Sequence, residues 1–157
     1  MQIGAVQPRA GDLSELYRER YAPMVRLGTL LLGSQHLAEE VVQDCFLRLQ
    51  PRFQQLDDPA GYLHRSVVNG CRSLMRRQRR ERDHLRATPG GMPAELGAHE
   101  LLDVLATLPE RQRAALVLRF YADLSGSEIA AILGCREGTV KSLIHRGLAK
   151  LRQEVGQ

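Results

Sequence analysis

The chain has 157 residues, 43% of them hydrophobic and 25% charged, a balance typical of a globular protein and not of a chain that is disordered throughout. The formal net charge of +4 is compatible with nucleic-acid binding but is too small to establish it. The longest apolar run, residues 27–33, is far shorter than the roughly 20 residues needed to cross a bilayer. The N-terminus also lacks a run of signal-peptide length, so we expect a cytoplasmic protein without membrane insertion.

The three cysteines, Cys45, Cys71 and Cys135, are odd in number and widely spaced, and no two of them form a CxxC pair. This pattern favours reduced core or boundary residues over a disulfide framework or a zinc site. His64 and Cys71 are seven residues apart and could share a helix face, but two ligands do not make a tetrahedral site. We therefore predict no metal ion and no cofactor.

The first predicted helix covers residues 13–32, where apolar residues recur at helical spacing. Pro23 must start, kink or interrupt this helix, because proline has no amide proton to donate. A second helix is predicted from a cap at Ser34 to residue 49. Its apolar residues at four-residue intervals predict a core-facing stripe of Leu37, Val41, Cys45 and Leu49.

A third helix is predicted over residues 61–80, after a looser stretch at residues 51–60. Its C-terminal end is strongly basic, because seven arginines fall within fifteen residues against only Glu81 and Asp83. Such a run can bind a polyanion through counterion release, and a solvated helix end is the alternative. The arginines are Arg72, Arg76, Arg77, Arg79, Arg80, Arg82 and Arg86.

A domain boundary is predicted near residues 83–98, because residues 87–97 hold two prolines and three glycines. This divides the chain into a unit at residues 11–82, a flexible linker and a unit at residues 99–157. We find almost no strand pattern along the chain. The predicted fold class is therefore all-α, with two small helical domains joined by the linker.

The second unit is predicted to begin with helices over residues 100–108 and 109–121, with Pro109 in the first turn of the latter. The next helix is marked by Ser125 and Glu128, whose spacing predicts a capping box. Gly134 is predicted to end it in the left-handed conformation that glycine adopts without a side-chain clash.

The helix after Gly134 is predicted to be amphipathic, with one apolar and one polar face. Val140, Ile144, Leu148 and Leu151 are expected to point inward, and Ser142, His145 and Arg146 outward, with Thr139 and Lys141 at the edges. The pattern indicates a helix-turn-helix, whose second helix enters the major groove of DNA. An ordinary helical hairpin with a solvated face is the alternative.

The stretch "LPERQRAALVLRFYADLSGSEIAAILGCREGTVKSLIHRGLAKLR" strongly resembles region four, the promoter-binding domain of bacterial extracytoplasmic-function sigma factors. The stretches "AEEVVQDCFLRL" and "PAGYLHRSVVNGCRSLMRRQRR" likewise resemble region two of that family. The resemblance covers nearly the whole chain, from about Leu13 to Val155. It implies a non-catalytic protein that binds core RNA polymerase and directs promoter-specific transcription initiation.

The resemblance also implies three sets of site residues. The docking set would contact the clamp helices of the largest polymerase subunit: Glu40, Gln43, Asp44, Phe46 and Arg48. The minus-ten set would melt and bind that promoter element, with help from loop residues 54–58: Tyr62, His64, Arg65, Asn69, Arg72, Arg76, Arg77, Arg79 and Arg80. The minus-thirty-five set would read that element in duplex DNA: Arg136, Thr139, Lys141, Ser142, His145 and Arg146.

Further partners implied by the resemblance are the flap of the second polymerase subunit and an anti-sigma factor. Within the minus-ten set, Asn69 would offer its amide to an extruded base. Two positions depart from the family pattern, since many members have tryptophan in place of Tyr62 and arginine in place of Leu143.

Three other function classes compete with the sigma-factor interpretation. A helix-turn-helix regulator that never engages polymerase would not need the docking-type helix or the arginine-ended helix. A nucleic-acid hydrolase would need a carboxylate or histidine cluster, for which Asp57 and Asp58 are not enough. A helical adaptor is the third alternative.

Overall fold

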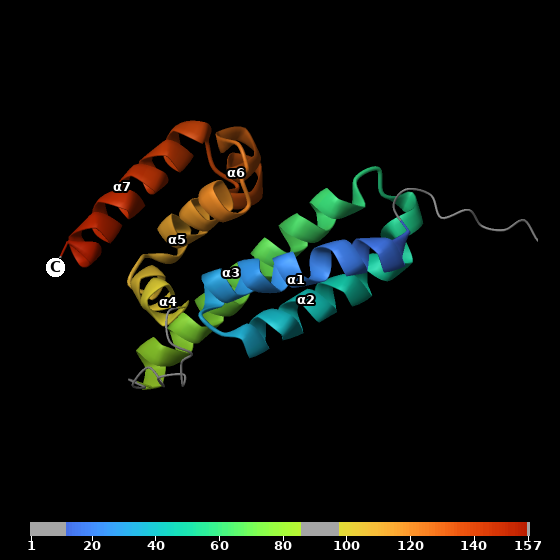
Figure 1. Ribbon diagram of the computed structural model, residues 1–157, viewed down its shortest axis with the longest axis horizontal. Helices are drawn as coiled ribbons and strands as arrows, with labels where there is room; N and C mark the ends of the chain where they lie inside the picture. The colour runs from blue at the N-terminus through green and yellow to red at the C-terminus, as the bar shows by residue number, and fades with distance from the viewer. Residues whose placement is uncertain (1–11, 86–97, 157) are drawn as a thin grey trace, which may run out of the picture.

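The computed structural model describes residues 12–85 and 98–156, and every structural statement below refers to them (Figure 1). Within these ranges the chain is helical and contains no strand, as the predicted fold class requires. The elements in chain order are α1 (Leu13–Leu32), α2 (Gln35–Leu49), η1 (Gln50–Gln55), α3 (Pro59–Leu85), α4 (Ala98–Ala106), α5 (Glu110–Leu116), η2 (Val117–Tyr121), α6 (Gly126–Leu133) and α7 (Glu137–Val155).

Helices α1, α2 and α3 pack together as the first bundle. Helix α1 continues through Pro23 and ends at Gly33, whose φ of 74° is left-handed. Ser34 caps α2 by accepting a hydrogen bond from the Leu37 amide at 3.2 Å, as predicted. A Cβ atom at Gly28 would lie 2.9 Å from the Ala38 Cβ, so the absence of a side chain there lets α1 and α2 approach closely.

The predicted core stripe of α2 is only partly correct. Cys45 and Leu49 are buried, whereas Leu37 and Val41 are half-buried. A four-residue repeat drifts by about 40° per step on a helix of 3.6 residues per turn, so it leaves the core face after one or two turns. The buried face also includes three residues outside the stripe: Ala38, Val42 and Phe46.

Helix α3 is longer at both ends than the predicted residues 61–80. Pro59 is its first residue, where the missing amide proton costs nothing, and the Asp58 carboxylate accepts a hydrogen bond from the Gly61 amide at 3.1 Å. The helix continues to Leu85, past the predicted end of the first unit at residue 82. The Pro- and Gly-rich part of the predicted linker lies outside the described residues.

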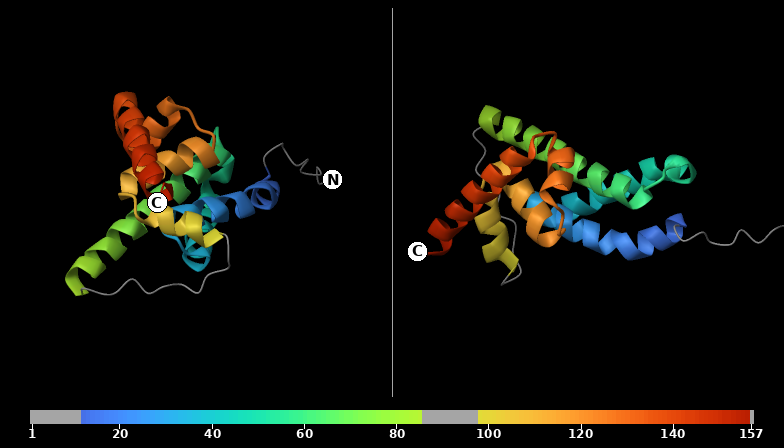
Figure 2. Two further views of the ribbon diagram at one scale, coloured as in Figure 1. Left: turned by 60° about the vertical axis from the view of Figure 1, so that its left-hand side comes forward. Right: turned by 90° about the horizontal axis from the view of Figure 1, so that it is seen from above.

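Helices α4 to α7 form the second bundle, with η2 continuing α5 as a single π-type turn. Its core contains Leu118, Ile129 and Val140. A Cβ atom at Gly147 would lie 2.8 Å from Leu116 Cδ1, so α5 and α7 cross at close range. The two bundles are in contact, with α4 and η2 beside α1, and α5 and α6 beside α3 (Figure 2).

Candidate interaction surfaces

The turn between α6 and α7 has the predicted helix-turn-helix geometry. Ser125 accepts a hydrogen bond from the Glu128 amide at 3.1 Å, and the Glu128 carboxylate accepts one from the Ser125 amide, which completes the capping box. Gly134 ends α6 with a φ of 65°. These local contacts fix the direction in which α7 leaves the turn.

The outward face of α7 carries the predicted polar residues. Lys141, Ser142, His145 and Arg146 are exposed, and Thr139 is half-buried at the edge of the face. Arg136, at the residue before the first turn of α7, is exposed as well. The Ser142 hydroxyl donates to the Gly138 carbonyl at 3.1 Å, which leaves its lone pairs free to accept. The structure thus brings all six residues of the minus-thirty-five set to one end of α7.

The inward face of α7 differs from the prediction. Val140 is buried, but Ile144, Leu148 and Leu151 are only partly buried, and Leu143 is buried with 7% of its surface exposed. Gly147 is also buried at this face, where α5 packs. The family departure at Leu143 therefore falls in the core of this structure and not on the outward face.

A groove between α2 and α3 gathers part of the minus-ten set. Tyr62, Asn69, Arg77 and Arg80 line it from α3, at spacings that place them along one side of that helix. The opposite wall comes from α2 and includes Asp44, whose carboxylate forms an ion pair with Arg48 at 3.0 Å. We call this the α2–α3 groove. Its α3 wall combines an aromatic ring, an amide and two guanidinium groups over about five helical turns.

The remaining minus-ten residues lie elsewhere on α3. His64 and Arg65 line a separate hollow at the junction of the two bundles, which we call the junction hollow. Arg72 is nearly buried and pairs with Glu110 of α5, Nε to Oε1, at 3.1 Å. Arg76 approaches the same carboxylate at 3.8 Å, and Arg79 is exposed. The structure therefore divides the minus-ten set between the α2–α3 groove, the junction hollow and the contact with Glu110, with Arg79 exposed outside all three.

His64 has an unusual environment in the junction hollow. Its Nε2 atom is buried without a hydrogen-bond partner. Burial lowers the pKa of His64 below its ordinary value of 6.5, and the positive charge of Arg20 lowers it further, while Glu128 acts in the opposite direction. At neutral pH the imidazole is therefore uncharged.

The docking set is divided between two sides of α2. Glu40 and Gln43 are exposed; the Glu40 carboxylate lies 3.2 Å from His36 Nε2, and Gln43 donates a hydrogen bond to the Tyr21 hydroxyl at 3.2 Å. Asp44 and Arg48 belong to the α2–α3 groove instead.

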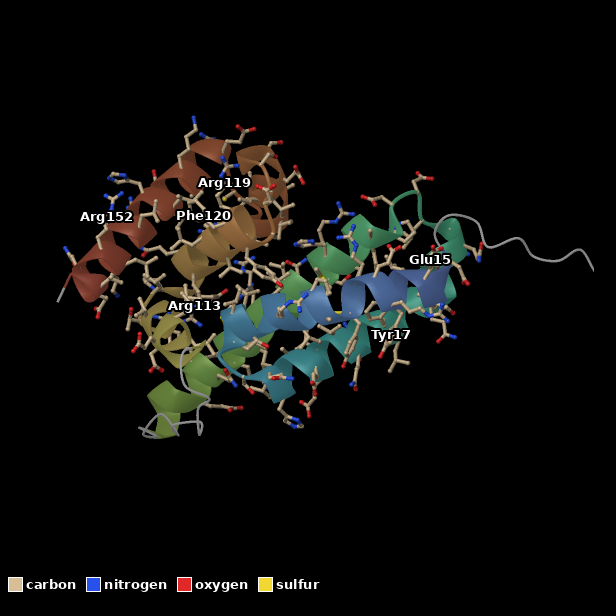
Figure 3. The ribbon with its side chains drawn as sticks, in the orientation of Figure 1. Glu15, Tyr17, Arg113, Arg119, Phe120 and Arg152 are labelled. Carbon is tan, nitrogen blue, oxygen red and sulfur yellow. The ribbon has the colours of Figure 1, made fainter. Side chains whose placement is uncertain are left out.

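Phe46 is a core residue as well as a candidate contact. It is buried, and its ring packs edge-on against Tyr17 of α1, with ring centroids 4.9 Å apart. One side of the ring lines a hollow between α1 and α2, together with Tyr17, Gln43 and Leu47, which we call the docking hollow. Sequence reasoning missed Tyr17 and Leu47, both of which are exposed (Tyr17 is labelled in Figure 3). Leu47 is apolar but lies outside the predicted core stripe of α2. An apolar residue at an outward position could have indicated this surface from the sequence.

The cysteines are free thiols, as predicted. Cys45 and Cys71 are buried and Cys135 is half-buried. Burial raises the pKa of Cys45 to about 11, helped by the Asp44 carboxylate, and burial raises that of Cys71 to about 12. Both therefore stay protonated. Within residues 12–85 and 98–156, no group of three or more metal-ligating side chains gathers in one place, and no described helix is long and apolar enough to span a membrane.

Comparison with family models gives two matches in chain order. The Sigma-70 region 2 model matches residues 16–81, and the Sigma-70, region 4 model matches residues 98–151. The first match covers the first bundle and the second covers the helix-turn-helix bundle. Together they define the class of the protein as a two-region sigma-70-type factor of transcription initiation.

Similar proteins identify the group of sigma factors to which the chain belongs. The RNA polymerase sigma-E factor of Streptomyces coelicolor is 32% identical over 152 residues, covering 92% of this chain and 86% of that protein. The ECF RNA polymerase sigma factor SigL of Mycobacterium tuberculosis is 31% identical over 169 residues, covering 98% of this chain and 96% of that protein. The chain belongs to the extracytoplasmic-function (ECF) RNA polymerase sigma factors.

Solved structures share the fold. The sigma factor RpoE of Bartonella quintana, in complex with the anti-sigma factor NepR, has a TM-score of 0.72 at 22% identity, covering 91% of this chain and 98% of that chain. CnrH, in complex with the cytosolic domain of CnrY, has a TM-score of 0.69 at 23% identity, covering 92% of this chain and 87% of that chain.

Proposed function

We propose that this sigma factor captures the unpaired strand of the minus-ten element in the α2–α3 groove. The observation that carries the proposal is the alignment of Tyr62, Asn69, Arg77 and Arg80 along one wall of that groove. An aromatic ring provides a stacking surface for a base, an amide offers both a donor and an acceptor to a base edge, and guanidinium groups bind phosphates. Binding energy for unstacked bases then offsets the cost of opening the duplex, and no catalytic step is needed.

The minus-thirty-five element is assigned to the outward face of α7. Side chains at the start of a recognition helix reach base edges in the major groove, and the six exposed or edge residues described above occupy that position. Because the Ser142 hydroxyl already donates to Gly138, Ser142 is suited to accept from a base amino group.

Core RNA polymerase is the proposed partner of the first bundle. Gln43 lines the apolar docking hollow and Glu40 is exposed one turn before it on α2, a combination of polar rim and apolar centre that suits a protein interface. The clamp helices of the largest subunit would bind here, and the flap of the second subunit would bind the second bundle. An anti-sigma factor is a further proposed partner, by analogy with the complexes named above.

We also propose the functional division of the chain. Residues 11–82 act as region two, residues 83–98 as the linker and residues 99–157 as region four. The protein is expected to act in the cytoplasm, where core polymerase is found, and to lack enzymatic activity of its own.

The proposal is tested by comparing two substitutions on two templates, with holoenzyme reconstituted from the full chain. Asn69→Ala should depress open-complex formation on duplex promoter DNA and lose much less on a template with a pre-opened bubble, where unpairing has already occurred. The matched control Ser142→Ala should reduce open-complex formation equally on both templates, because its contact lies in upstream duplex DNA. The expected cost is about 1–3 kcal/mol per base contact. Equal losses for Asn69→Ala on both templates would remove the groove assignment.

A further inference from the structure

The docking hollow between α1 and α2 holds apolar surface that the described part of the chain leaves uncovered. Six large apolar or aromatic side chains are exposed in the described ranges, and two of them, Tyr17 and Leu47, line this hollow with 44% and 68% of their surfaces open. Phe46 lies beside them and is buried. Apolar surface that gathers in one hollow, and is not scattered singly, indicates a binding site.

The aromatic wall of the hollow is held in place by its neighbours. Tyr17 stacks on Tyr21 of the same helix, with ring centroids 4.9 Å apart, and meets Phe46 of α2 edge-on at 4.9 Å. The Gln43 side chain donates to the Tyr21 hydroxyl at 3.2 Å, which ties α2 to this aromatic cluster. In Figure 3, Tyr17 projects from α1 on the side of α2. A ligand would therefore meet a preformed wall, and little conformational entropy would be lost on binding.

Among the described residues, the only charged one that lines the hollow is Arg18, which follows Tyr17 on α1. Its side chain is exposed and forms no hydrogen bond or ion pair with any described residue. Glu15 and Glu19 of α1 are exposed as well but do not line the hollow. The other polar residues of the lining are uncharged: Ser14, Gln43 and Gln50. The hollow therefore favours an anion over a cation.

Size and chemistry together define the class of ligand. The hollow offers about 540 Å³, and small-molecule sites have volumes of about 300–1,000 Å³. An aromatic ring fits against Tyr17 and Leu47, while a planar carboxylate on that ring can pair with both arms of the Arg18 guanidinium. An uncharged aliphatic molecule would leave Arg18 without a partner, and a polyphosphate would find no second cation among the described lining residues.

We propose that the docking hollow binds a small aromatic acid, with Arg18 pairing with the acid group and with Tyr17 and Leu47 holding the ring. A bound acid would also oppose polymerase docking, because it would fill the hollow that we assign to the polymerase. The binding site itself follows from the lining of the hollow. Its effect on docking rests on the proposed function, so the two parts are tested by separate measurements.

The role of Arg18 is tested with two dyes that share one ring system. Anilinonaphthalene sulfonate carries an acid group and phenylnaphthylamine does not, and both become fluorescent on apolar protein surface. Titrated into the full chain, the sulfonate dye should saturate at one molecule per chain. Arg18→Gln should weaken its binding about tenfold and leave the binding of the neutral dye unchanged. Wild-type affinity of the sulfonate dye for Arg18→Gln would overturn the proposal.

Arg152→Gln is the matched control for the charge. Arg152 is exposed in the last turn of α7 and lies far from Tyr17 (Figure 3). Its substitution removes the same charge from the protein, so it separates a local ion pair from a change in net charge. The sulfonate dye should bind Arg152→Gln as it binds wild type. Equal losses in Arg18→Gln and Arg152→Gln would show only long-range attraction and would overturn the site.

Leu47→Ser tests whether the dyes occupy this hollow. It should weaken the binding of both dyes several-fold, whereas Leu101→Ser should weaken neither, because Leu101 is exposed on α4, away from the lining of the hollow. Both leucines are exposed, so circular dichroism should show wild-type helix content in both variants. Wild-type affinity in Leu47→Ser, or equal losses in the two variants, would mean that the dyes bind elsewhere and would overturn the proposal.

Competition between two small molecules tests the class of ligand. Naphthoate should displace the sulfonate dye from the wild-type chain at concentrations at which naphthalenemethanol, which has the same ring and a hydroxyl group, does not. The carboxylate can pair with Arg18 and the hydroxyl group cannot match that charge. Equal displacement by the two molecules would contradict an acid-binding site.

The effect on docking is tested by adding core RNA polymerase to the dye-saturated chain. Dye fluorescence should fall as the complex forms, and a high concentration of naphthoate should weaken complex formation. Dye that stays bound in the complex would contradict the polymerase docking that we assign to this hollow. The Arg18 and Leu47 variants would still decide the ligand site, so the two failures are distinguishable.

Discussion

Phe46 and Leu47 are neighbours in sequence with opposite surroundings. Phe46 has 7% of its surface exposed and packs against Tyr17, whereas Leu47 is 68% exposed at the rim of the docking hollow. A substitution at Phe46 would therefore disturb folding and docking together. A substitution at Leu47 tests the same surface without disturbing folding.

Phe46→Ala is expected to destabilise the protein by about 3–5 kcal/mol, because it removes a buried aromatic side chain and leaves a cavity. Leu47→Ala should change stability by less than about 0.5 kcal/mol, since the site is exposed. It should nevertheless weaken core polymerase binding by about tenfold, the effect of losing a well-packed contact worth about 1.4 kcal/mol. Urea denaturation and a polymerase binding titration measure the two effects. Wild-type affinity in Leu47→Ala would exclude the docking hollow as the polymerase site.

His64 is the residue through which we expect pH to act in the mildly acidic range. Its pKa is lowered by burial, so the folded protein binds a proton less readily than the unfolded chain does. The charged groups that face the same hollow are Arg20 of α1, Glu128 of α6, and Asp58 and Arg65 at the start of α3.

The stabilising effect of neutral His64 is complete above its unfolded pKa of about 6.5 and is lost as the pH falls through the lower folded value. Wild-type protein should therefore lose more stability between pH 7.5 and pH 5 than His64→Gln, which cannot titrate. Urea unfolding at the two pH values gives the comparison. Parallel losses in both proteins would show that His64 does not titrate differently on folding.

At the level of elements, the start of α6 determines how the recognition helix is presented. The capping box at Ser125 and Glu128 satisfies two amides that the helix itself cannot pair, and Gly134 sets the turn into α7. Helix α6 has only eight residues, so it depends on these end contacts more than a long helix would.

Ser125→Ala should cost about 1 kcal/mol of stability, the usual effect of losing an N-cap. Ser127→Ala is the control, because Ser127 lies in the same helix and is exposed. Thermal unfolding and binding to a minus-thirty-five duplex should both show the difference, since a frayed α6 no longer positions α7. Equal stability of the two variants would mean that the cap does not limit the folding of this bundle.

Sequence patterns correctly predicted features that depend on neighbouring residues, such as helix caps. They failed for features that depend on residues far along the chain. The Ser34 and Ser125 caps, the Gly134 turn and the exposed polar face of α7 all follow from residues within one or two turns. The burial of Arg72 could not be predicted, because its partner Glu110 is 38 residues away and belongs to the other bundle. Tertiary contacts likewise divide the arginine run, because Arg77 and Arg80 line the groove whereas Arg72 and Arg76 approach Glu110.

Across the whole molecule, the buried apolar residues of both bundles form one continuous cluster. Arg72, Arg113 and Tyr121 add polar contacts between the bundles. We therefore expect the two bundles to unfold together at low salt.

Scanning calorimetry should show one cooperative transition for the wild-type chain at low salt, with equal calorimetric and van't Hoff enthalpies. In Glu110→Gln the transition should broaden or divide in two, because each bundle then unfolds by itself. Glu100→Gln should behave as wild type. A single unchanged transition in Glu110→Gln would show that the ion pair does not couple the bundles.

The Arg72–Glu110 pair also has a thermodynamic consequence for how the two promoter elements are bound. If the bundles separate when promoter DNA is bound, the element that engages first supplies the free energy of separating them, and the second element then binds without that cost. The affinity for one element should therefore rise when the other is occupied, and linkage requires the factor to be the same in both directions. One ion pair between two bundles would in this way make the recognition of a complete promoter cooperative, and a site with only one of its elements would be bound weakly.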